Sequence, residues 1–345
     1  MLLSRQLAIH LRVSGLAIFA LGIFVCAGAQ DTPANLERKM RMLEEGEVTR
    51  VLGEAEHGNA NAQLWAGLIY ELGTHVERSD SRAAEWFTKA ADQGSAPAKF
   101  FLGNMYARGA GVKKDDQHAA ELYKAAAQAG YPAAESTMGT ISLQGRGTAR
   151  SAAEAFQWFS KAANHKFAEG EYKLAGLYKD GIGVQQDCTL AIKWYIAAAE
   201  QLYVPAQTAI GDLYSSGTCT DQDYGKAAKI YKSAAEHGDA KAQASLGSLY
   251  LMGRGVDQNQ EQAFRWFSKS ADSGDALGQF MLGQMYREGH GVDQDLEAAY
   301  KWFTIASENG YETDGRKYVR DQLSAKQIKS AEAAANEWIK QHQAR

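Results

Sequence analysis

One pattern of apolar and polar positions recurs along the chain. After Asp295, the apolar residues Ala299, Trp302, Phe303 and Ala306 follow the spacing i, i+3, i+4, i+7, which places them on one face of a helix. Asp is a preferred N-cap, so this helix is predicted to start just after Asp295. A preceding helical stretch ends in glycine, a residue suited to the left-handed conformation that closes many helices.

The same pattern returns every 36 residues without insertions. A small residue marks the same position in seven copies: Gly67, Gly103, Gly139, Ala175, Gly211, Gly247 and Gly283. Six residues later every copy has Gly, sixteen later Ala, and twenty later an aromatic residue. A fixed period in this range is typical of a solenoid built from one supersecondary unit. The sequence therefore predicts an all-α solenoid of helix–turn–helix repeats.

The repeats define the domain organisation. Residues 1–29 are predicted to be a cleaved signal peptide, because Arg5 and Arg12 precede an apolar stretch and the small residues at 27–29. That stretch, 13–26, is shorter than the roughly 20 residues of a membrane span, although an uncleaved anchor is the alternative. Residues 30–58 are predicted to hold one capping helix (36–56), and residues 59–310 the seven repeats. Residues 311–345 are predicted to hold the C-terminal capping helices, the first over 316–323 and the last running from a capping box that begins at Ser324 through Trp338.

Composition and motifs exclude several function classes. The net charge is −4 and no basic run stands out, so we expect no nucleic-acid partner. The recurrent Gly-x-Gly loops lack the Lys-Ser/Thr of a phosphate-binding loop, and they recur as turns would. No metal-ligand spacing or nucleophile motif is found, so we expect no metal, no cofactor and no catalytic residues. We also expect a monomer without stable membrane insertion once the signal peptide is removed.

Two cysteines remain after the predicted signal peptide is removed. Cys188 follows the N-cap Asp187, and Cys219 lies in the loop of the next repeat. Both positions lie on the same edge of adjacent repeats. We expect a disulfide between them, which would staple two repeats together.

The motif from Leu282 to Ser307, with Leu-Gly, Tyr, Gly-x-Gly-Val, Asp, Ala and Trp-Phe at fixed spacing, resembles the Sel1-like repeat, a relative of the tetratricopeptide repeat. The resemblance covers residues 59–310. Single residues depart from the repeat motif at Ser142, Lys166, Ala175, Leu202 and Cys219. It implies a right-handed superhelix whose concave face, lined by the first helices, binds proteins or peptides. Cysteine-stapled relatives bridge the helices of one unit, so a Cys188–Cys219 bridge would depart from them.

The resemblance also implies which residues would line that groove. They are Phe100, Asn104, Arg108, Gln144, Tyr172, Lys179, Asp180, Asp212, Phe280, Gln284, Arg287 and Glu288. Large groups at a nominally exposed position suit a peptide-binding surface. The alternative is that Phe100, Tyr172 and Phe280 pack against the neighbouring repeat.

Two function classes remain open from the sequence. The favoured one is a non-enzymatic adaptor or regulator of the bacterial cell envelope, periplasmic or secreted, which binds a protein partner in the groove. The alternative is a binder of small molecules or cell-wall fragments with weak hydrolase activity, as cysteine-rich relatives resemble penicillin-binding proteins. The mature chain holds no Ser-x-x-Lys, so the nucleophile of such an activity is missing.

Overall fold

The computed structural model describes residues 32–311 and 314–343, so the predicted signal peptide lies outside the described residues. In this part of the chain all regular structure is helical, and the chain divides into two compact units at Asp187/Cys188. The first unit contains α2 (Pro33–Arg41), α3 (Glu45–Glu56), α4 (Ala60–Leu72), α5 (Asp80–Asp92), α6 (Ala96–Arg108), α7 (Asp116–Gln128), α8 (Pro132–Gln144), α9 (Ala152–Asn164) and α10 (Ala168–Asp180). The second contains α11 (Cys188–Glu200), α12 (Val204–Ser216), α13 (Tyr224–Glu236), α14 (Ala240–Met252), α15 (Gln260–Asp272), α16 (Ala276–Glu288), α17 (Leu296–Glu308), α18 (Gly315–Arg320) and α19 (Ala325–Gln343).

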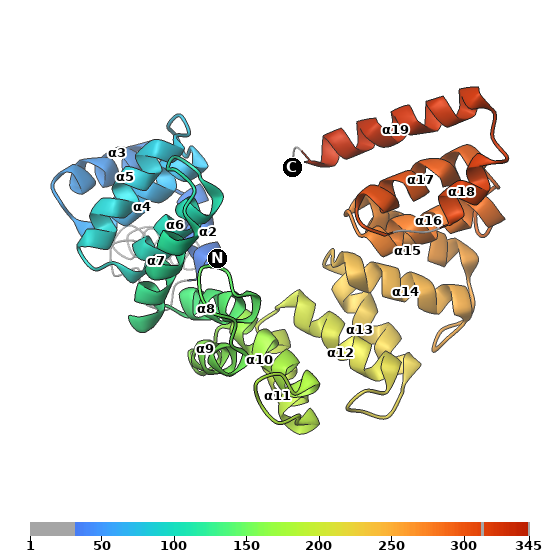
Figure 1. Cartoon of the computed structure of the whole chain (residues 1–345), viewed down its shortest axis with the longest axis horizontal. Helices are drawn as coiled ribbons and strands as arrows, with labels where there is room; N and C mark the ends of the chain where they lie inside the picture. The colour runs from blue at the N-terminus through green and yellow to red at the C-terminus, as the bar shows by residue number, and fades with distance from the viewer. Residues whose placement is uncertain (1–31, 312–313, 344–345) are drawn as a thin grey trace, which may run out of the picture. The chain divides into compact units, whose positions relative to one another are not determined.

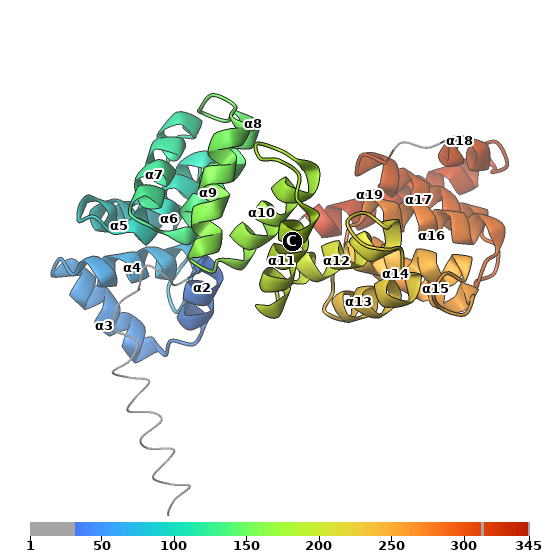
Figure 2. The same cartoon turned by 90° about the horizontal axis from the view of Figure 1, so that it is seen from below.

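Within each unit, every helix of the repeats packs on the helices next to it in sequence. In the first unit α4 pairs with α5, α6 with α7 and α8 with α9, and each pair contacts the next pair (Figure 1). In the second unit α12 to α17 pair in the same way, and Figure 2 shows α14 to α17 side by side. This nearest-neighbour packing makes the fold the all-α solenoid that the period predicts.

The ends of the helices follow the polar pattern. The second helices begin after N-caps whose side-chain oxygens accept backbone N–H groups of the first turn: Ser79, Asp115, Ser151, Asp223, Asn259 and Asp295. The first helices from α4 to α16 end in glycine with φ between +65° and +76°. An L side chain is disfavoured there, which explains why this position is always Gly.

The closest contact inside a repeat joins the small residue of the first helix to the aromatic ring of the second. A Cβ built on Gly67 would lie 2.3 Å from the Phe87 ring, and one on Gly139 would lie 2.6 Å from the Phe159 ring. Both rings are fully buried. At Gly67 and Gly139 glycine lets the ring lie directly on the backbone of the first helix, so this contact sets how closely the two helices pack there.

The N-terminal cap differs from the single helix predicted for residues 36–56. The structure has two helices there, α2 and α3, separated at Met42–Glu44. Glu44 is extended, and its N–H donates to the Glu47 carboxylate at 3.0 Å, which starts a new helix. Leu43 is buried at the break. The single-helix prediction was wrong because it overlooked this capping pair.

The C-terminal cap contains two helices, with bounds that differ from those expected from the sequence. The helix expected from 316 to 323 is the short α18, which ends at Arg320. Ser324 starts α19 as predicted: its N–H donates to Gln327 Oε1 at 3.1 Å. Trp338 of α19 packs edge-on against Trp302 of α17, with ring centroids 5.7 Å apart. This contact covers the apolar side of the last repeat.

Cys188 and Cys219 form a disulfide in the structure, with an S–S distance of 2.00 Å. Cys219 occupies the second loop position, where five other repeats have a glycine that lies against the start of the preceding second helix and the first repeat has His75. For example, a Cβ on Gly183 would lie 2.2 Å from the carbonyl oxygen of Ala152. At Cys219 the facing residue is Cys188, the first residue of α11, and a covalent bond replaces the close backbone contact.

We predict opposite effects for two glycine-to-alanine substitutions. Gly67→Ala should lower the free energy of unfolding by about 1–3 kcal/mol, because the new methyl group overlaps the Phe87 ring. Gly53→Ala, within α3 and with no atom within 4 Å of the added methyl group, should raise it by up to about 1 kcal/mol through helix propensity. Urea unfolding followed by circular dichroism measures both. Equal effects would contradict the steric role of Gly67.

We also predict that the disulfide stabilises the second unit. The bridge spans 31 residues, for which the chain-entropy model gives about 3–4 kcal/mol. Cys188→Ser with Cys219→Ser should therefore lower the melting temperature, and a reductant should lower it in the wild type only. A thiol titration in denaturant, before and after reduction, should show two additional thiols. Finding both already free before reduction would contradict the prediction.

Candidate functional site

The predicted groove residues all lie on first helices, but they are divided between the two units. Phe100, Asn104 and Arg108 are on α6, Gln144 on α8, Tyr172 and Lys179 on α10, Asp212 on α12, and Phe280, Gln284 and Arg287 on α16. The structure therefore places the members on α6, α8 and α10 in the first unit, and the members on α12 and α16 in the second.

The aromatic members are more enclosed than a peptide-binding surface requires. Phe100 is only 7% exposed, and its ring lies 5.4 Å from Tyr131 and 5.8 Å from Tyr123. Phe280 is half-buried and stacks on Tyr311 at 4.8 Å. The placement of Phe100 on an open groove surface was wrong, because the following helix and the loop after it supply rings that cover it. Tyr172 is half-buried.

Two polar members have partners within their own repeat. The Tyr123 hydroxyl donates to Asn104 Oδ1 at 2.8 Å, and the Tyr231 hydroxyl donates to Asp212 Oδ1 at 2.7 Å. Burial raises the pKa of Tyr123 to about 12. Burial, together with the hydrogen bond to Asp212, also raises the pKa of Tyr231.

Gln284 follows the small residue of its first helix, as Asn104 and Asp212 do, but the aromatic residue of its repeat is Phe303 rather than Tyr. Its Oε1 is buried without a hydrogen-bond partner in the described part of the chain. In two repeats a tyrosine of the second helix donates to this first-helix position, Tyr123 to Asn104 and Tyr231 to Asp212, whereas Gln284 lacks such a donor.

The charged members form ion pairs. Arg108 Nη2 lies 2.6 Å from Glu71 Oε1, which joins α6 to α4 across two repeats. Lys179 pairs with Asp180 at 3.3 Å. Arg287 pairs with Glu288, and its guanidinium lies 5.7 Å from the centroid of the Tyr318 ring. The first-helix face therefore has mixed charge, as its sequence indicates.

A pocket of about 270 Å³ opens on the first-helix face of the first unit. Its lining comes from α6, α7, α8, α10 and the loop after α8: Ala107, Asp116, Ala119, Tyr123, Thr137, Thr140, Ile141, Gln144, Arg146, Glu169 and Lys173. Arg146 pairs with Asp116 at 3.0 Å at its edge. Of the predicted groove residues only Gln144 lines it. The other lining residues, such as Thr137 and Arg146, were not predicted; Arg146 lies in the loop after α8, whereas the family resemblance placed the groove on first helices alone.

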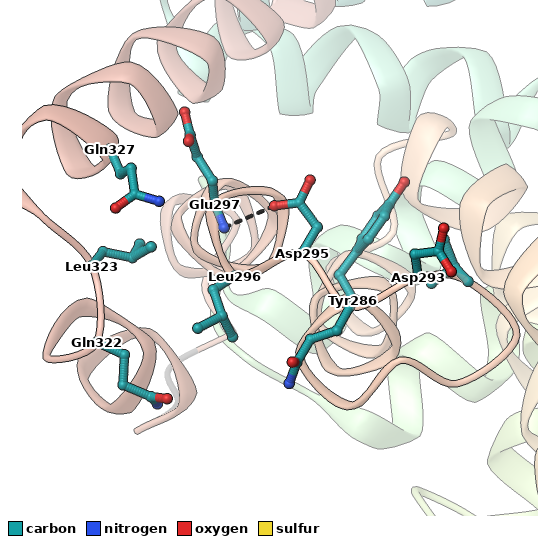
Figure 3. Close-up of a pocket in the computed structure, with 10 residues that line it drawn as sticks. Tyr286, Asp293, Asp295, Leu296, Glu297, Gln322, Leu323 and Gln327 are labelled. Atoms are coloured by element: carbon teal, nitrogen blue, oxygen red, sulfur yellow. Dashed lines mark hydrogen bonds between the residues drawn. The ribbon is translucent and has the colours of Figure 1, made fainter.

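A second pocket, of about 490 Å³, lies where the last repeat meets the C-terminal cap (Figure 3). Tyr286 forms one wall, while Gln322, Leu323 and Gln327 come from the turn between α18 and α19 and from the start of α19. Asp293, Asp295 and Glu297 also line it, and Asp295 accepts the N–H of Glu297 at 3.0 Å as the cap of α17. Burial, followed by the charges of Asp295 and Asp272, raises the pKa of Tyr286. Three carboxylates without a lining cation make this pocket unsuited to an anion.

The described residues contain no cluster of His, Cys, Asp and Glu that could hold a metal ion. Nor does any helix among them have the length and apolar character needed to cross a bilayer. The histidines at helix ends have structural partners: His57 and His237 each contact a carbonyl oxygen at 2.7 Å. His165 Nδ1 instead lies 2.8 Å from the buried carboxylate of Glu135.

The raised pKa of Tyr123 predicts a pH-dependent stability. Because the unfolded phenol ionises near pH 10 and the folded one at about 12, stability is lost as the pH rises through this interval. Tyr123→Phe should cost about 1 kcal/mol at neutral pH through the lost bond to Asn104, yet lose less stability in alkali. Urea unfolding of both proteins at neutral pH and in the alkaline interval measures these free energies. Parallel pH profiles of the two proteins would contradict it.

The helix pairs match a known repeat family. The family model of the Sel1 repeat matches residues 60–95, 96–131, 132–167, 168–201, 204–239, 240–275 and 276–311. A comparison with curated proteins finds no match.

Two similar solved structures are Sel1-type proteins of bacteria. A Sel1 repeat protein from Oxalobacter formigenes is 31% identical, with a TM-score of 0.64, over 84% of this chain and 85% of its own. The protein c5321, a protective antigen present in uropathogenic Escherichia coli strains that displays an SLR fold, is 29% identical, with a TM-score of 0.51, over 90% of this chain and 76% of its own. With seven matched repeats and these two likenesses, the chain belongs to the Sel1 repeat family.

Proposed function

We propose that the protein is a non-enzymatic adaptor or regulator that holds a protein or peptide partner against the first-helix face of its repeats. Sel1 repeat proteins generally mediate protein–protein interactions, which supports the class of function. The observation that carries the choice of surface is the pocket formed by α6, α7, α8 and α10.

The lining of this pocket suits a short polypeptide segment. Thr137, Thr140 and Gln144 present hydroxyl and amide groups beside the apolar surface of Ala107 and Ile141. Such groups can bond the backbone of an extended segment, while the apolar surface receives a small side chain. The ion pairs at the edge, Arg146 with Asp116 and Lys173 with Glu169, add charges of both signs. The partner segment is therefore expected to be polar and of low net charge.

We further propose that the protein acts in the bacterial cell envelope, in the periplasm or after secretion. The proposal rests on the basic, apolar and small-residue segments of residues 1–29, which are typical of a cleaved signal peptide. The disulfide of the second unit is consistent with an oxidising compartment.

The test is affinity capture from envelope extract with two matched variants. Gln144→Arg places a long cationic side chain at the pocket, whereas Gln157→Arg makes the same change on an exposed residue of α9 outside it. Quantitative mass spectrometry should find a protein that the wild type and Gln157→Arg retain and that Gln144→Arg retains at least about fivefold less, because steric and charge mismatch at a buried contact costs about 1 kcal/mol or more. Identical sets from both variants would contradict the groove assignment. Signal cleavage is checked by N-terminal sequencing of the exported chain.

A further inference from the structure

A second binding site is indicated by a tyrosine that lacks the ring contact made by its counterparts. Six repeats have Tyr three residues after the small residue of the first helix. Five of these rings have a close partner: Tyr70 with Arg82, Tyr106 with His118, Tyr178 with Phe156, Tyr214 with Lys226 and Tyr286 with Phe264. The sixth, Tyr250 of α14, has no aromatic or cationic ring partner in the described part of the chain.

Two of these contacts show what is missing at Tyr250. Phe156 of α9 lies edge-on to Tyr178 of the next repeat, with centroids 5.6 Å apart and planes at 89°. Phe264 of α15 lies on Tyr286 in the same way, at 5.4 Å and 88°. The equivalent residue before Tyr250 is Ala228 of α13, 36 residues before Phe264 and 72 after Phe156. A methyl group therefore occupies the position of a phenyl ring.

A pocket of about 540 Å³ is present at this joint between α13 and α14. Ala228, Leu246, Tyr250 and Val256 provide its apolar walls. Leu246 is only 1% exposed, whereas Tyr250 is half-buried. The space beside Tyr250, which a phenyl ring fills beside Tyr178 and Tyr286, is thus accessible to a ring from another molecule.

The edge of this pocket is basic. Lys226, Lys229 and Lys232 of α13 line it, against a single carboxylate, that of Asp223. Asp223 caps α13 and pairs with Lys226 at 3.4 Å. Lys229 and Lys232 are exposed and form no ion pair within the described residues. Two ammonium groups are therefore available to carboxylates of a ligand, whose approach they would favour.

We propose that this pocket binds an aromatic side chain, phenylalanine in the first instance, from an acidic segment of a partner protein. The ring would lie edge-on to Tyr250 as Phe156 does to Tyr178, and carboxylates on neighbouring residues would pair with Lys229 and Lys232. An edge-to-face ring pair adds to the gain from burying the ring itself. The site lies in the second unit, and it is independent of the groove proposed for the first.

The test uses a synthetic peptide, acetyl-Gly-Glu-Glu-Phe-Glu-Gly-amide, titrated into the full chain by calorimetry. Three control peptides replace Phe by Ala, Phe by Leu, or all three Glu by Gln. The wild type should bind the Phe peptide at least about tenfold more tightly than the Ala peptide, because a buried ring contributes the corresponding free energy. The Leu peptide should bind more weakly than the Phe peptide. The Gln peptide should bind more weakly and with little dependence on salt.

Two protein variants separate the contributions of the ring and the charges. Ala228→Phe supplies from within the chain the ring found at Phe156 and Phe264, so it should abolish the preference for Phe over Ala without lowering the melting temperature. Lys229→Glu with Lys232→Glu changes only exposed side chains, and it should weaken binding of the Phe peptide at least about tenfold. If circular dichroism shows that Ala228→Phe does not fold, the lysine variant and the peptide series test the proposed site without it.

Some outcomes would overturn the proposal. These are equal affinity for the Phe and Ala peptides, unchanged binding by folded Ala228→Phe, or unchanged binding by the lysine variant. Equal binding of the Leu and Phe peptides would overturn the aromatic preference. Gln144→Arg should bind the Phe peptide like the wild type, so failure of the groove proposal and failure of this one are distinguishable.

Discussion

The structure depends on one close contact, in which the aromatic ring of the second helix lies on the small residue of the first helix, a glycine in six of the seven repeats. At Gly67, Gly139 and Gly211 a single added carbon would lie within 2.6 Å of that ring. The contact therefore limits how far apart the two helices of a pair can lie. Because the pairs are alike, the surfaces they present to neighbouring repeats are alike too, and the same pair can be stacked repeatedly.

A constant backbone lets single substitutions create local differences in chemistry. At the first-helix position after the small residue, Asn104 and Asp212 accept hydrogen bonds from tyrosines, whereas Gln284 keeps a buried acceptor without a partner among the described residues. At the second loop position, glycine is replaced by Cys219, and a backbone contact becomes a disulfide. At the joint of α13 and α14, Ala228 stands where two other repeats have phenylalanine, and a pocket lies beside it. In each case the difference is seen by comparing one residue with the equivalent residues of the other repeats.

The two proposed sites use this variation differently. The groove of the first unit lies on first helices and presents hydroxyl, amide and paired charged groups, which suit a polar backbone. The pocket of the second unit lies between a second helix and the next first helix, and it combines apolar walls with exposed lysines. An adaptor with both could hold one partner at two points, which increases affinity when the linking segment spans the sites.

The sequence by itself determined the helix pairs, their period, their N-caps and their closing glycines, because these depend on local hydrogen bonds and on φ angles that residue types directly control. It did not determine the break between α2 and α3, nor which groove residues stay accessible. Phe100 was expected at the surface, but Tyr123 and Tyr131 cover it. The pocket at Tyr250 also became visible only in three dimensions, because an empty space depends on side chains that three separate segments bring together. Burial and voids are properties of packing between elements, so only the tertiary structure could decide them.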